Sequence, residues 1–309
     1  MKVLLYGSKG WIGNIFLEII KKDNIEFIEG KARCDNEKEL KEEIENINPT
    51  HIFFSCGRTH GTLEDGTKIN TIDYLEKGKL YENIRDNLFS HILLAHICNE
   101  KNIHLTAIET GCIFNKNILH EDGTVENGYT EEDNGNYWGS SYSCVKLFCD
   151  RLLKLYNNNI LVLRIRMPIT ETVNTRNFIT KITTYEKICS VPNSMTILPE
   201  LLPIALDMMK TNSVGTYNFT NPGVISHNEI LEMYREIVNP DFTWKNFSIE
   251  EQDKILASKR SNNYLDTTKL ENYVKSRNLT LSNIKDGIRK VLHLYKEDLE
   301  NKGELRVIG

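Results

Sequence analysis

The sequence predicts an α/β fold built on a doubly wound parallel sheet, with a smaller region at the C-terminal end. Short apolar runs alternate with amphipathic stretches through the first half of the chain, which is the pattern of βαβ units. Glycines follow the first apolar run, at the point where a strand would turn into a helix. The 309 residues are 40% hydrophobic and 26% charged, close to the average of soluble globular proteins, so a large core can form.

Hydrophobic periodicity predicts the individual elements. The candidate strands, each roughly four to seven residues long and rich in Val, Ile, Leu or Phe, are 2–6, 25–29, 51–55, 103–108 and 160–165. Apolar residues at helical spacing predict helices over 11–22, 81–100 and 140–156. In the less regular second half, we expect helices near 178–186, 200–210, 227–237, 267–276 and 281–299, and a strand near 216–220.

Two long stretches, 57–81 and 115–139, interrupt this alternation. Loops of this length in a compact domain usually bind a ligand or close over one, so we expect a functional role for both. The sequence does not say what the first of them contacts. After the fifth strand the alternation is lost, which divides the chain into 1–165 and a region 166–309 that is partly interleaved with it.

Charge and composition exclude several classes of protein. A net charge of −5 argues against a generally basic nucleic-acid binder. No apolar stretch approaches the ~20 residues that cross a bilayer, so we expect no membrane partner. The odd number of cysteines, seven, and an N-terminus that does not resemble a signal peptide favour a reducing, cytoplasmic location.

The glycines of K-V-L-L-Y-G-S-K-G-W-I-G predict a dinucleotide-binding, Rossmann-type turn. Gly7, Gly10 and Gly13 have the G-x-x-G-x-x-G spacing associated with short-chain dehydrogenase-type folds. Glycine there lets the chain approach a pyrophosphate and directs the helix N-terminus at its charge. The predicted cofactor contacts in this turn are Gly7, Ser8, Lys9, Gly10, Trp11, Ile12 and Gly13. Residues 1–165 would therefore form the dinucleotide-binding domain.

The end of the second candidate strand bears on the choice of cofactor. An acidic residue there, such as Glu29, would suit the ribose 2′-hydroxyl of NADH, whereas Lys31 and Arg33 follow at once. The planar guanidinium of Arg33 suits a 2′-phosphate. The sequence favours NADPH and leaves NADH open.

Tyr142 and Lys146 lie four residues apart in Y-S-C-V-K, so they share one face of a predicted helix. A neighbouring ammonium lowers the pKa of a tyrosine and can also hold the nicotinamide ribose, giving the acid that a ketone reduction requires. Thr110 ends the fourth candidate strand, where its hydroxyl could bind the same carbonyl beside Tyr142. Asn87, in the preceding helix, could hold a water next to Lys146.

Together these features resemble an extended short-chain dehydrogenase/reductase of the nucleotide-sugar branch. More closely, the sequence is similar to the bifunctional UDP-4-keto-6-deoxy-D-glucose 3,5-epimerase/4-reductases of UDP-L-rhamnose synthesis. The segments that carry this resemblance are E-T-G-C-I-F, R-I-R-M-P-I, R-N-F-I-T-K-I-T, V-P-N-S-M-T-I-L, Y-N-F-T-N-P-G-V-I-S-H-N-E-I-L-E-M-Y-R and R-S-N-N-Y-L-D. The stretch 57–81 departs from the family pattern and is longer and more charged.

The resemblance implies epimerisation at C3 and C5 followed by NADPH-dependent reduction at C4. It assigns Cys112 as the base and Lys181 as its acid partner. Cys112 lies two residues beyond Thr110, so both side chains can point into one crevice, and a nearby cation would make its thiolate a competent base. The region 166–309 would bind the nucleotide-sugar, with Arg260 at the diphosphate. The residues expected to border the sugar and uracil are Asn177, Phe178, Val191 and Asn193.

Other interpretations remain open at this stage. They are a monofunctional 4-keto-6-deoxy nucleotide-sugar reductase resembling dTDP-4-dehydrorhamnose reductase, a GDP-4-keto-6-deoxymannose epimerase/reductase, and a non-catalytic regulatory subunit. The sequence does not separate UDP from dTDP, and it leaves the oligomeric state open, a homodimer included. We expect a separate 4,6-dehydratase to supply the substrate. Because no Cys or His pair has zinc-site spacing, we expect no metal.

Overall fold

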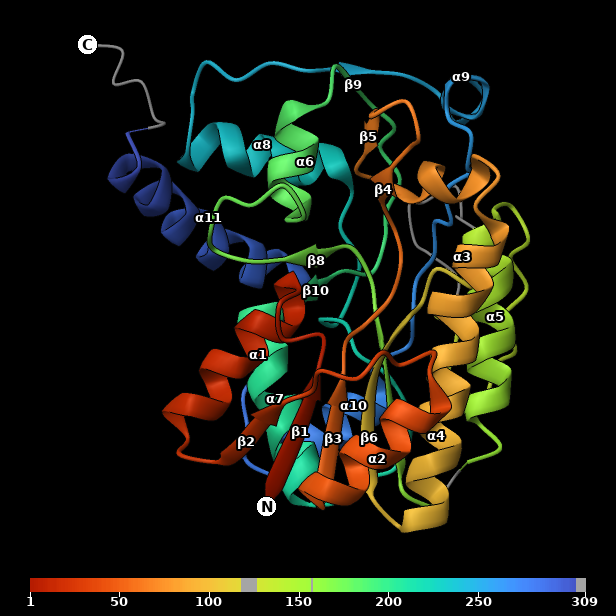
Figure 1. The fold of residues 1–309 in the computed structure, drawn as a ribbon. Helices are drawn as coiled ribbons and strands as arrows, with labels where there is room; N and C mark the ends of the chain where they lie inside the picture. The colour runs from red at the N-terminus through yellow and green to blue at the C-terminus, as the bar shows by residue number, and fades with distance from the viewer. Residues whose placement is uncertain (118–126, 157, 304–309) are drawn as a thin grey trace.

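The computed structural model describes residues 1–117, 127–156 and 158–303. Its centre is a six-stranded parallel sheet in the order β11-β7-β6-β3-β1-β2, seen edge-on in the lower half of Figure 1. The strands are β1 (Lys2–Tyr6), β2 (Glu26–Glu29), β3 (His51–Phe54), β6 (His104–Thr110), β7 (Ile160–Ile165) and β11 (Gly215–Asn218). The order reverses between β1 and β3, and a crevice at the carboxyl ends of these strands is where such sheets bind ligands.

Helices cover both faces of the sheet, which confirms the doubly wound α/β prediction (Figure 1). One face is covered by α1 (Trp11–Lys22), α7 (Leu198–Lys210) and α10 (Thr268–Ser276). The other is covered by α2 (Glu37–Ile47), α4 (Ser90–Lys101) and α5 (Ser141–Leu153). Each face has its own apolar cluster, with Phe16 stacked on Phe53 at 3.7 Å between ring centroids on the first.

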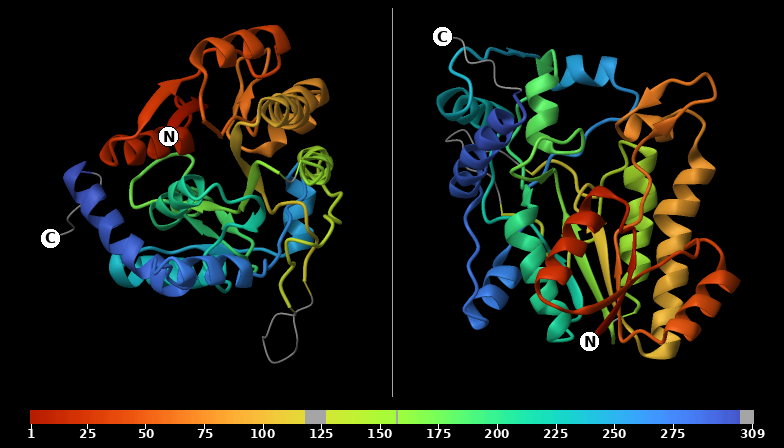
Figure 2. Two further views of the ribbon diagram at one scale, coloured as in Figure 1. Left: turned by 90° about the horizontal axis from the view of Figure 1, so that it is seen from below. Right: turned by 60° about the vertical axis from the view of Figure 1, so that its left-hand side comes forward.

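A smaller region lies beyond the carboxyl ends of the strands and has a third apolar cluster. Its helices are α6 (Phe178–Thr184), α8 (His227–Ile237), α9 (Ile249–Ile255) and α11 (Ile284–Asn301). Its short strands are β8 (Pro168–Ile169), β9 (Lys187–Ile188), β10 (Thr196–Ile197) and β12 (Lys245–Asn246). Helices α8 and α11 pack side by side at its outer edge (Figures 1 and 2).

The second half of the chain also completes the sheet, since β11 and α7 both follow residue 166. The division of the chain into two partly interleaved regions with a boundary at 165 stays a prediction.

The expected helix over 81–100 is longer and not uniform. It runs as α3 (Leu80–Ile84), a π-helical turn η2 (Arg85–Phe89) and α4 without a break in the chain. A π turn adds one residue to a helical turn and is often found at functional sites. Here it faces the carboxyl end of the sheet.

The stretch 57–81 is not an unstructured loop. It forms an antiparallel pair, β4 (Gly61–Thr62) and β5 (Lys68–Ile69), and the 3₁₀ helix η1 (Ile72–Glu76). Part of the other predicted loop, residues 118–126, lies outside the described residues. None of the helices in the described ranges combines the length and apolarity that a membrane span requires.

Candidate active site

The turn after β1 has no room for side chains at two of its glycines. A Cβ on Gly13 would lie 2.1 Å from the Gly7 carbonyl oxygen, and one on Gly7 would lie 2.6 Å from the Ser55 hydroxyl. Gly7 also has a φ of 90°, which favours glycine. Gly10 is the N-cap of α1 and has no side chain with which to cap it. The first backbone N–H groups of α1 thus remain available to a phosphate, as a dinucleotide requires.

The other residues predicted for this turn have different environments. Ser8 is buried and Lys9 is exposed, whereas Trp11 and Ile12 are half-buried and pack against the apolar cluster below α1.

A cavity of about 320 Å³ lies beside this turn and is lined mainly by the segments that follow β1, β2 and β3. Arg33 and Arg58 both line it, so two cations are available to a phosphate. Each is paired with a carboxylate, Arg33 with Asp35 at 2.9 Å and Arg58 with Asp86 at 2.9 Å. A 2′-phosphate would therefore compete with these carboxylates.

The loop that carries Arg33 is held by Glu43 of α2, a residue that the sequence did not single out. Its carboxylate accepts hydrogen bonds from the backbone N–H groups of Lys31 and Ala32, at 2.7 and 3.0 Å, and from the Tyr6 hydroxyl at 2.8 Å.

The predicted catalytic groups of β6 and α5 meet at the carboxyl end of the sheet. The Thr110 and Tyr142 hydroxyls are hydrogen-bonded, and the buried Lys146 lies one turn further along α5. Burial raises the pKa of Tyr142 above its ordinary value, and this outweighs the lowering by Lys146 and the Thr110 hydrogen bond. The expectation of a lowered tyrosine pKa was therefore wrong, and Tyr142 is held in its protonated form.

Beside Lys146 lies a carboxylate that sequence reasoning missed. Lys146 Nζ lies 2.6 Å from Glu109 Oε2, and His91 Nδ1 lies 2.7 Å from the other carboxylate oxygen. His91, Glu109 and Cys149 could in principle offer ligand atoms to a metal. The Lys146 ammonium on the same carboxylate opposes the approach of a cation there.

Asn87 lies in the π turn, buried, with its amide engaged by the chain around it. Its Oδ1 accepts from Arg58 N at 2.7 Å, and its Nδ2 donates to Arg58 O and to Asn83 Oδ1 at 2.7 and 2.8 Å. The structure thus brings Asn87 together with the segment 57–58, and no hydrogen bond joins it to Lys146 within the described ranges.

Cys112 has the cationic neighbour that its proposed chemistry needs. The Nη1 of Arg166 donates to Cys112 Sγ at 3.6 Å and to the Gly111 carbonyl at 3.1 Å. Arg166 directly follows β7 and is 1% exposed. Its other nitrogen, Nη2, donates to Asn193 Oδ1 at 2.6 Å. The charge in an otherwise apolar strand end, R-I-R-M, was the signal that could have identified it.

Lys181 lies on α6, near two further cations. Burial lowers its pKa below the ordinary lysine value, and the charges of Arg176 and Arg260 lower it further. Among the described residues, no hydrogen bond joins Lys181 to Cys112, so any pairing of the two would act through a substrate between them.

Arg260 is fixed by the stretch 57–81. It forms an ion pair with Asp73 of η1 and donates to Ser258 O at 2.8 Å. Asp73 also accepts from Ser258 N at 2.9 Å. This previously unassigned stretch therefore packs against the segment that carries Arg260.

The remaining predicted substrate residues have mixed environments. Asn177 is buried and caps α6, accepting from Ile179 N at 3.2 Å. Phe178 contacts the His227 ring edge-on at 5.1 Å. The Asn193 amide is used by Arg166, Val191 O and Asn262. Of these four residues, only Val191 lines the cavity described next.

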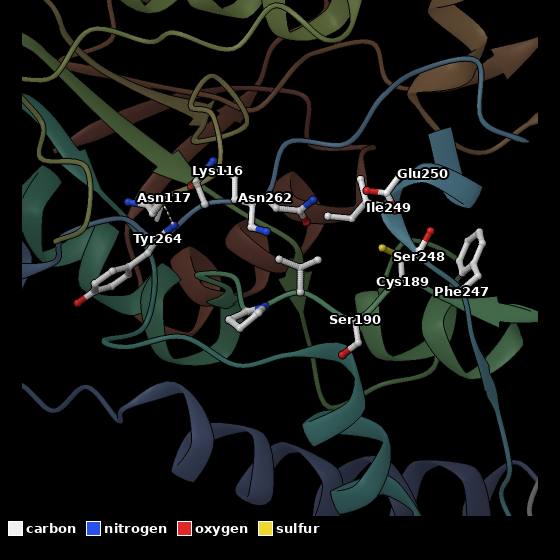
Figure 3. Close-up of a pocket in the computed structure, with 13 residues that line it drawn as sticks. Lys116, Asn117, Cys189, Ser190, Phe247, Ser248, Ile249, Glu250, Asn262 and Tyr264 are labelled. Carbon is white, nitrogen blue, oxygen red and sulfur yellow. Dashed lines mark hydrogen bonds between the residues drawn. The ribbon is translucent and has the colours of Figure 1, made fainter. Parts of the chain in front are cut away.

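That cavity, of about 310 Å³, opens between the segment 116–117, which follows β6, and three segments of the smaller region, 189–192, 247–250 and 262–264 (Figure 3). One wall is tied by a hydrogen bond of 2.8 Å from Tyr264 N to Asn117 Oδ1. Its lining mixes apolar groups, such as Val191 and Phe247, with amides and hydroxyls. Such a mixture suits a base and sugar better than a purely apolar ligand.

No protein-family model matches the chain. It is 47% identical over 298 residues to protein L780 of Acanthamoeba polyphaga mimivirus, covering 96% of this chain and 99% of that protein. The crystal structure of that protein, described as a UDP-rhamnose synthase, matches with a TM-score of 0.89 over 95% of this chain and 99% of the other.

Plant proteins are nearly as similar. An Arabidopsis thaliana bifunctional dTDP-4-dehydrorhamnose 3,5-epimerase/dTDP-4-dehydrorhamnose reductase is 46% identical over 269 residues, 87% of this chain and 86% of that one. A trifunctional Arabidopsis protein, named UDP-glucose 4,6-dehydratase/UDP-4-keto-6-deoxy-D-glucose 3,5-epimerase/UDP-4-keto-L-rhamnose-reductase, is 44% identical over 272 residues, which are 39% of its length. The chain thus belongs to the family of rhamnose-forming 3,5-epimerase/4-reductases that these relatives represent.

Proposed function

We propose that this protein converts UDP-4-keto-6-deoxy-D-glucose to UDP-L-rhamnose by 3,5-epimerisation and then by NADPH-dependent reduction of the 4-keto group. The proposal is carried by one observation: the side chains for reduction and the side chains for epimerisation lie together at the carboxyl end of β6. Thr110 and Tyr142 form one set, and Cys112 with Arg166 forms the other. Both stages act on the same keto group, so one pocket can serve both.

The epimerisation begins with Cys112. The protons on C3 and C5 are acidic because each lies next to the C4 ketone. Cys112 would remove one of them as a thiolate, with the Arg166 guanidinium hydrogen-bonded to its sulfur. Lys181 returns a proton from the opposite face, and its lowered pKa makes it a better donor than an ordinary lysine.

The reduction uses Tyr142 as the acid. Its raised pKa keeps the hydroxyl protonated, ready to give its proton to the C4 oxygen. The Thr110 hydroxyl orients Tyr142 and can share the same oxygen. Stabilising that oxygen serves the enolate of the first stage and the alkoxide of the second.

NADPH supplies the hydride when it is bound. The turn of Gly7, Gly10 and Gly13 fits its pyrophosphate, because side chains at two of these positions would fill the cradle. Arg33 and Arg58 line the adjoining cavity and would face the 2′-phosphate. Lys146, fixed by Glu109, would hold the nicotinamide ribose.

The cavity of Figure 3 would take the nucleoside of the substrate, with Val191 on its wall and Arg260 at the diphosphate. Asn177 and Asn193 would hold the surrounding chain in place and not contact the substrate, since their amides are hydrogen-bonded to other groups of the protein. We expect a 4,6-dehydratase to supply the substrate, an activity that one plant relative carries in the same polypeptide.

A homodimer would bury the exposed apolar face of α3 and α5, which lie side by side (Figure 1). Phe148 and Leu152 of α5 lie four residues apart and are 50% and 38% exposed, and Leu155, just beyond the helix, is 74% exposed. Tyr81 of α3 is 76% exposed. Light scattering of the wild type and of Phe148→Asp tests this association. A monomeric wild type would contradict it.

The function itself is tested by incubating the protein with UDP-4-keto-6-deoxy-D-glucose and NADPH and identifying the product by NMR. UDP-L-rhamnose is expected, with one NADPH consumed for each molecule formed. A protein that reduces only an already epimerised ketone would instead be a monofunctional reductase. Parallel reactions with the dTDP-sugar measure the nucleotide preference.

A further inference from the structure

Glu109 is a buried carboxylate on a strand face that is otherwise apolar. It precedes Thr110, and its neighbours on β6 include Leu105, which belongs to the apolar cluster of α4 and α5, and the buried Ala107. The Glu109 side chain is 1% exposed, as is that of His91, and Lys146 is 4% exposed. A carboxylate this deep is costly unless it is paired, so its position calls for a function.

Both carboxylate oxygens are engaged, each by a different helix. Oε2 lies 2.6 Å from Lys146 Nζ of α5, and Oε1 lies 2.7 Å from His91 Nδ1 of α4. The Cys149 thiol of α5 also donates to Oε1, at 3.4 Å. Burial favours the neutral acid, but Lys146 and His91 outweigh it and lower the pKa of Glu109 to about 2. Glu109 is therefore ionised at any working pH.

His91 serves as the fixed partner of this carboxylate. Burial lowers the pKa of His91, and the charge of Lys146 lowers it further, so the imidazole is neutral. A neutral imidazole can donate one hydrogen bond from Nδ1 while it holds the carboxylate in place.

The Glu109 carboxylate and the Lys146 ammonium both act on the charge state of Tyr142. The charged and titratable groups that face its hydroxyl are Lys146 on its own helix, Glu109 on β6 and Cys112 just beyond β6. Burial is the main cause that raises the pKa of Tyr142, whereas Lys146 draws the phenol toward its ionised form. The negative charge of Glu109 opposes that effect of Lys146. Tyr142 can act as an acid only in its protonated form.

We infer that Glu109 is a positioning residue for the reduction, held by His91, which fixes the Lys146 ammonium and offsets its charge so that Tyr142 stays protonated. The inference rests on the proposed function, because it gives a role to a residue behind Lys146. It also accounts for a lysine so deeply buried beside the cofactor site.

The test is the pH profile of the reduction, measured with the epimerised ketone and NADPH in wild type and in Glu109→Gln. The amide keeps the shape of the side chain and removes its charge. Without that charge, either Tyr142 ionises earlier or the buried Lys146 loses its proton earlier. In both cases activity is lost at lower pH. We expect the alkaline limb to move down by at least about one pH unit, so that the ratio of kcat at high pH to kcat at pH 7 falls about tenfold.

Two further variants make the test specific. Glu109→Asp keeps the charge at a greater distance and should move the alkaline limb in the same direction as Glu109→Gln, but by a smaller amount. Asp150→Asn is the matched control, since Asp150 is another buried carboxylate of this region, paired with Arg164 at 2.8 Å and not with Lys146. It should lower the thermal stability and leave the profile of the folded enzyme unchanged.

The outcomes separate this inference from the proposed function. If the wild type does not reduce the ketone, the proposed function fails. If the wild type reduces it and folded Glu109→Gln or Glu109→Asp shows an unchanged alkaline limb, the inference is wrong. Should Glu109→Gln not fold, Glu109→Asp and His91→Gln still decide, since each must shift the limb in the same direction by a smaller amount.

Discussion

The Arg166 guanidinium donates a hydrogen bond to Cys112 Sγ across 3.6 Å, and both groups lie at the end of the central sheet. Arg166 comes from the strand next to the one that leads to Cys112. The contact holds a fixed guanidinium against the sulfur of the cysteine that would act as the base of the epimerisation.

Replacing Arg166 should therefore slow the epimerisation selectively. For Arg166→Met, we expect the exchange of C3 and C5 protons with solvent deuterium to fall about tenfold or more, since a hydrogen bond to a charged group contributes about 1.5–3 kcal/mol. The measurement is NMR of the sugar in deuterated buffer. Arg164→Met is the matched control, because Arg164 is equally buried but pairs with Asp150. Equal losses in the two folded variants would contradict the role of Arg166.

Tyr142→Phe should separate the two stages in the opposite way. Removing the acid should lower the rate of reduction by about 10²–10⁴. The exchange at C3 and C5, measured without NADPH, should remain close to that of the wild type. Reduction at the wild-type rate in this variant would exclude Tyr142 as the acid.

Lys181 predicts a pH dependence for the epimerisation. An acid must be protonated, so activity is present below its pKa and lost as the pH rises through it. Because burial and the cations Arg176 and Arg260 lower this pKa, the loss should come below the ordinary lysine value of about 10.4. Lys181→Arg keeps the charge but cannot release its proton, so formation of the epimerised product should fall at least about tenfold. Lys187→Arg, at the exposed first residue of β9, should have no effect.

Arg33 should distinguish the two nicotinamide cofactors. For Arg33→Ala, we expect the KM for NADPH to rise about tenfold or more, because one charge-assisted contact to the 2′-phosphate is lost. The KM for NADH should not change. Lys38→Ala, an exposed cation of α2, serves as the control. Equal changes for the two cofactors would place the 2′-phosphate elsewhere.

Much of the fold could be predicted from the sequence. The strands 2–6 and 160–165 and the helices 11–22 and 227–237 have the expected bounds, since each has a clear hydrophobic period. Helix α2 was missed because Leu40 and Ile44 are its only buried residues among charged neighbours. The short pair β4 and β5 and the helix η1 are held by distant contacts, such as that of Asp73 with Arg260, and leave no periodic signal.

The site shows the same division. Thr110, Tyr142, Lys146 and Cys112 could be proposed from local spacing and strand ends, and the structure brings Thr110, Tyr142 and Lys146 together at the end of β6, where Cys112 follows. Their partners, Glu109 and Arg166, could not be predicted in this way. Glu109 contacts groups on two helices, and Arg166 contacts Cys112 from 54 residues away. Such pairings depend on strand order, which spacing alone does not reveal. A charged residue at an apolar strand end was the only available sign.

The most direct test of the account is deuterium exchange in Cys112→Ala. The wild type, given UDP-4-keto-6-deoxy-D-glucose in deuterated water without NADPH, should incorporate deuterium at C3 and C5. The variant should incorporate none, yet it should still reduce the already epimerised ketone with NADPH at close to the wild-type rate. Full exchange in folded Cys112→Ala, or no exchange in the wild type, would contradict the proposal that one pocket both epimerises and reduces.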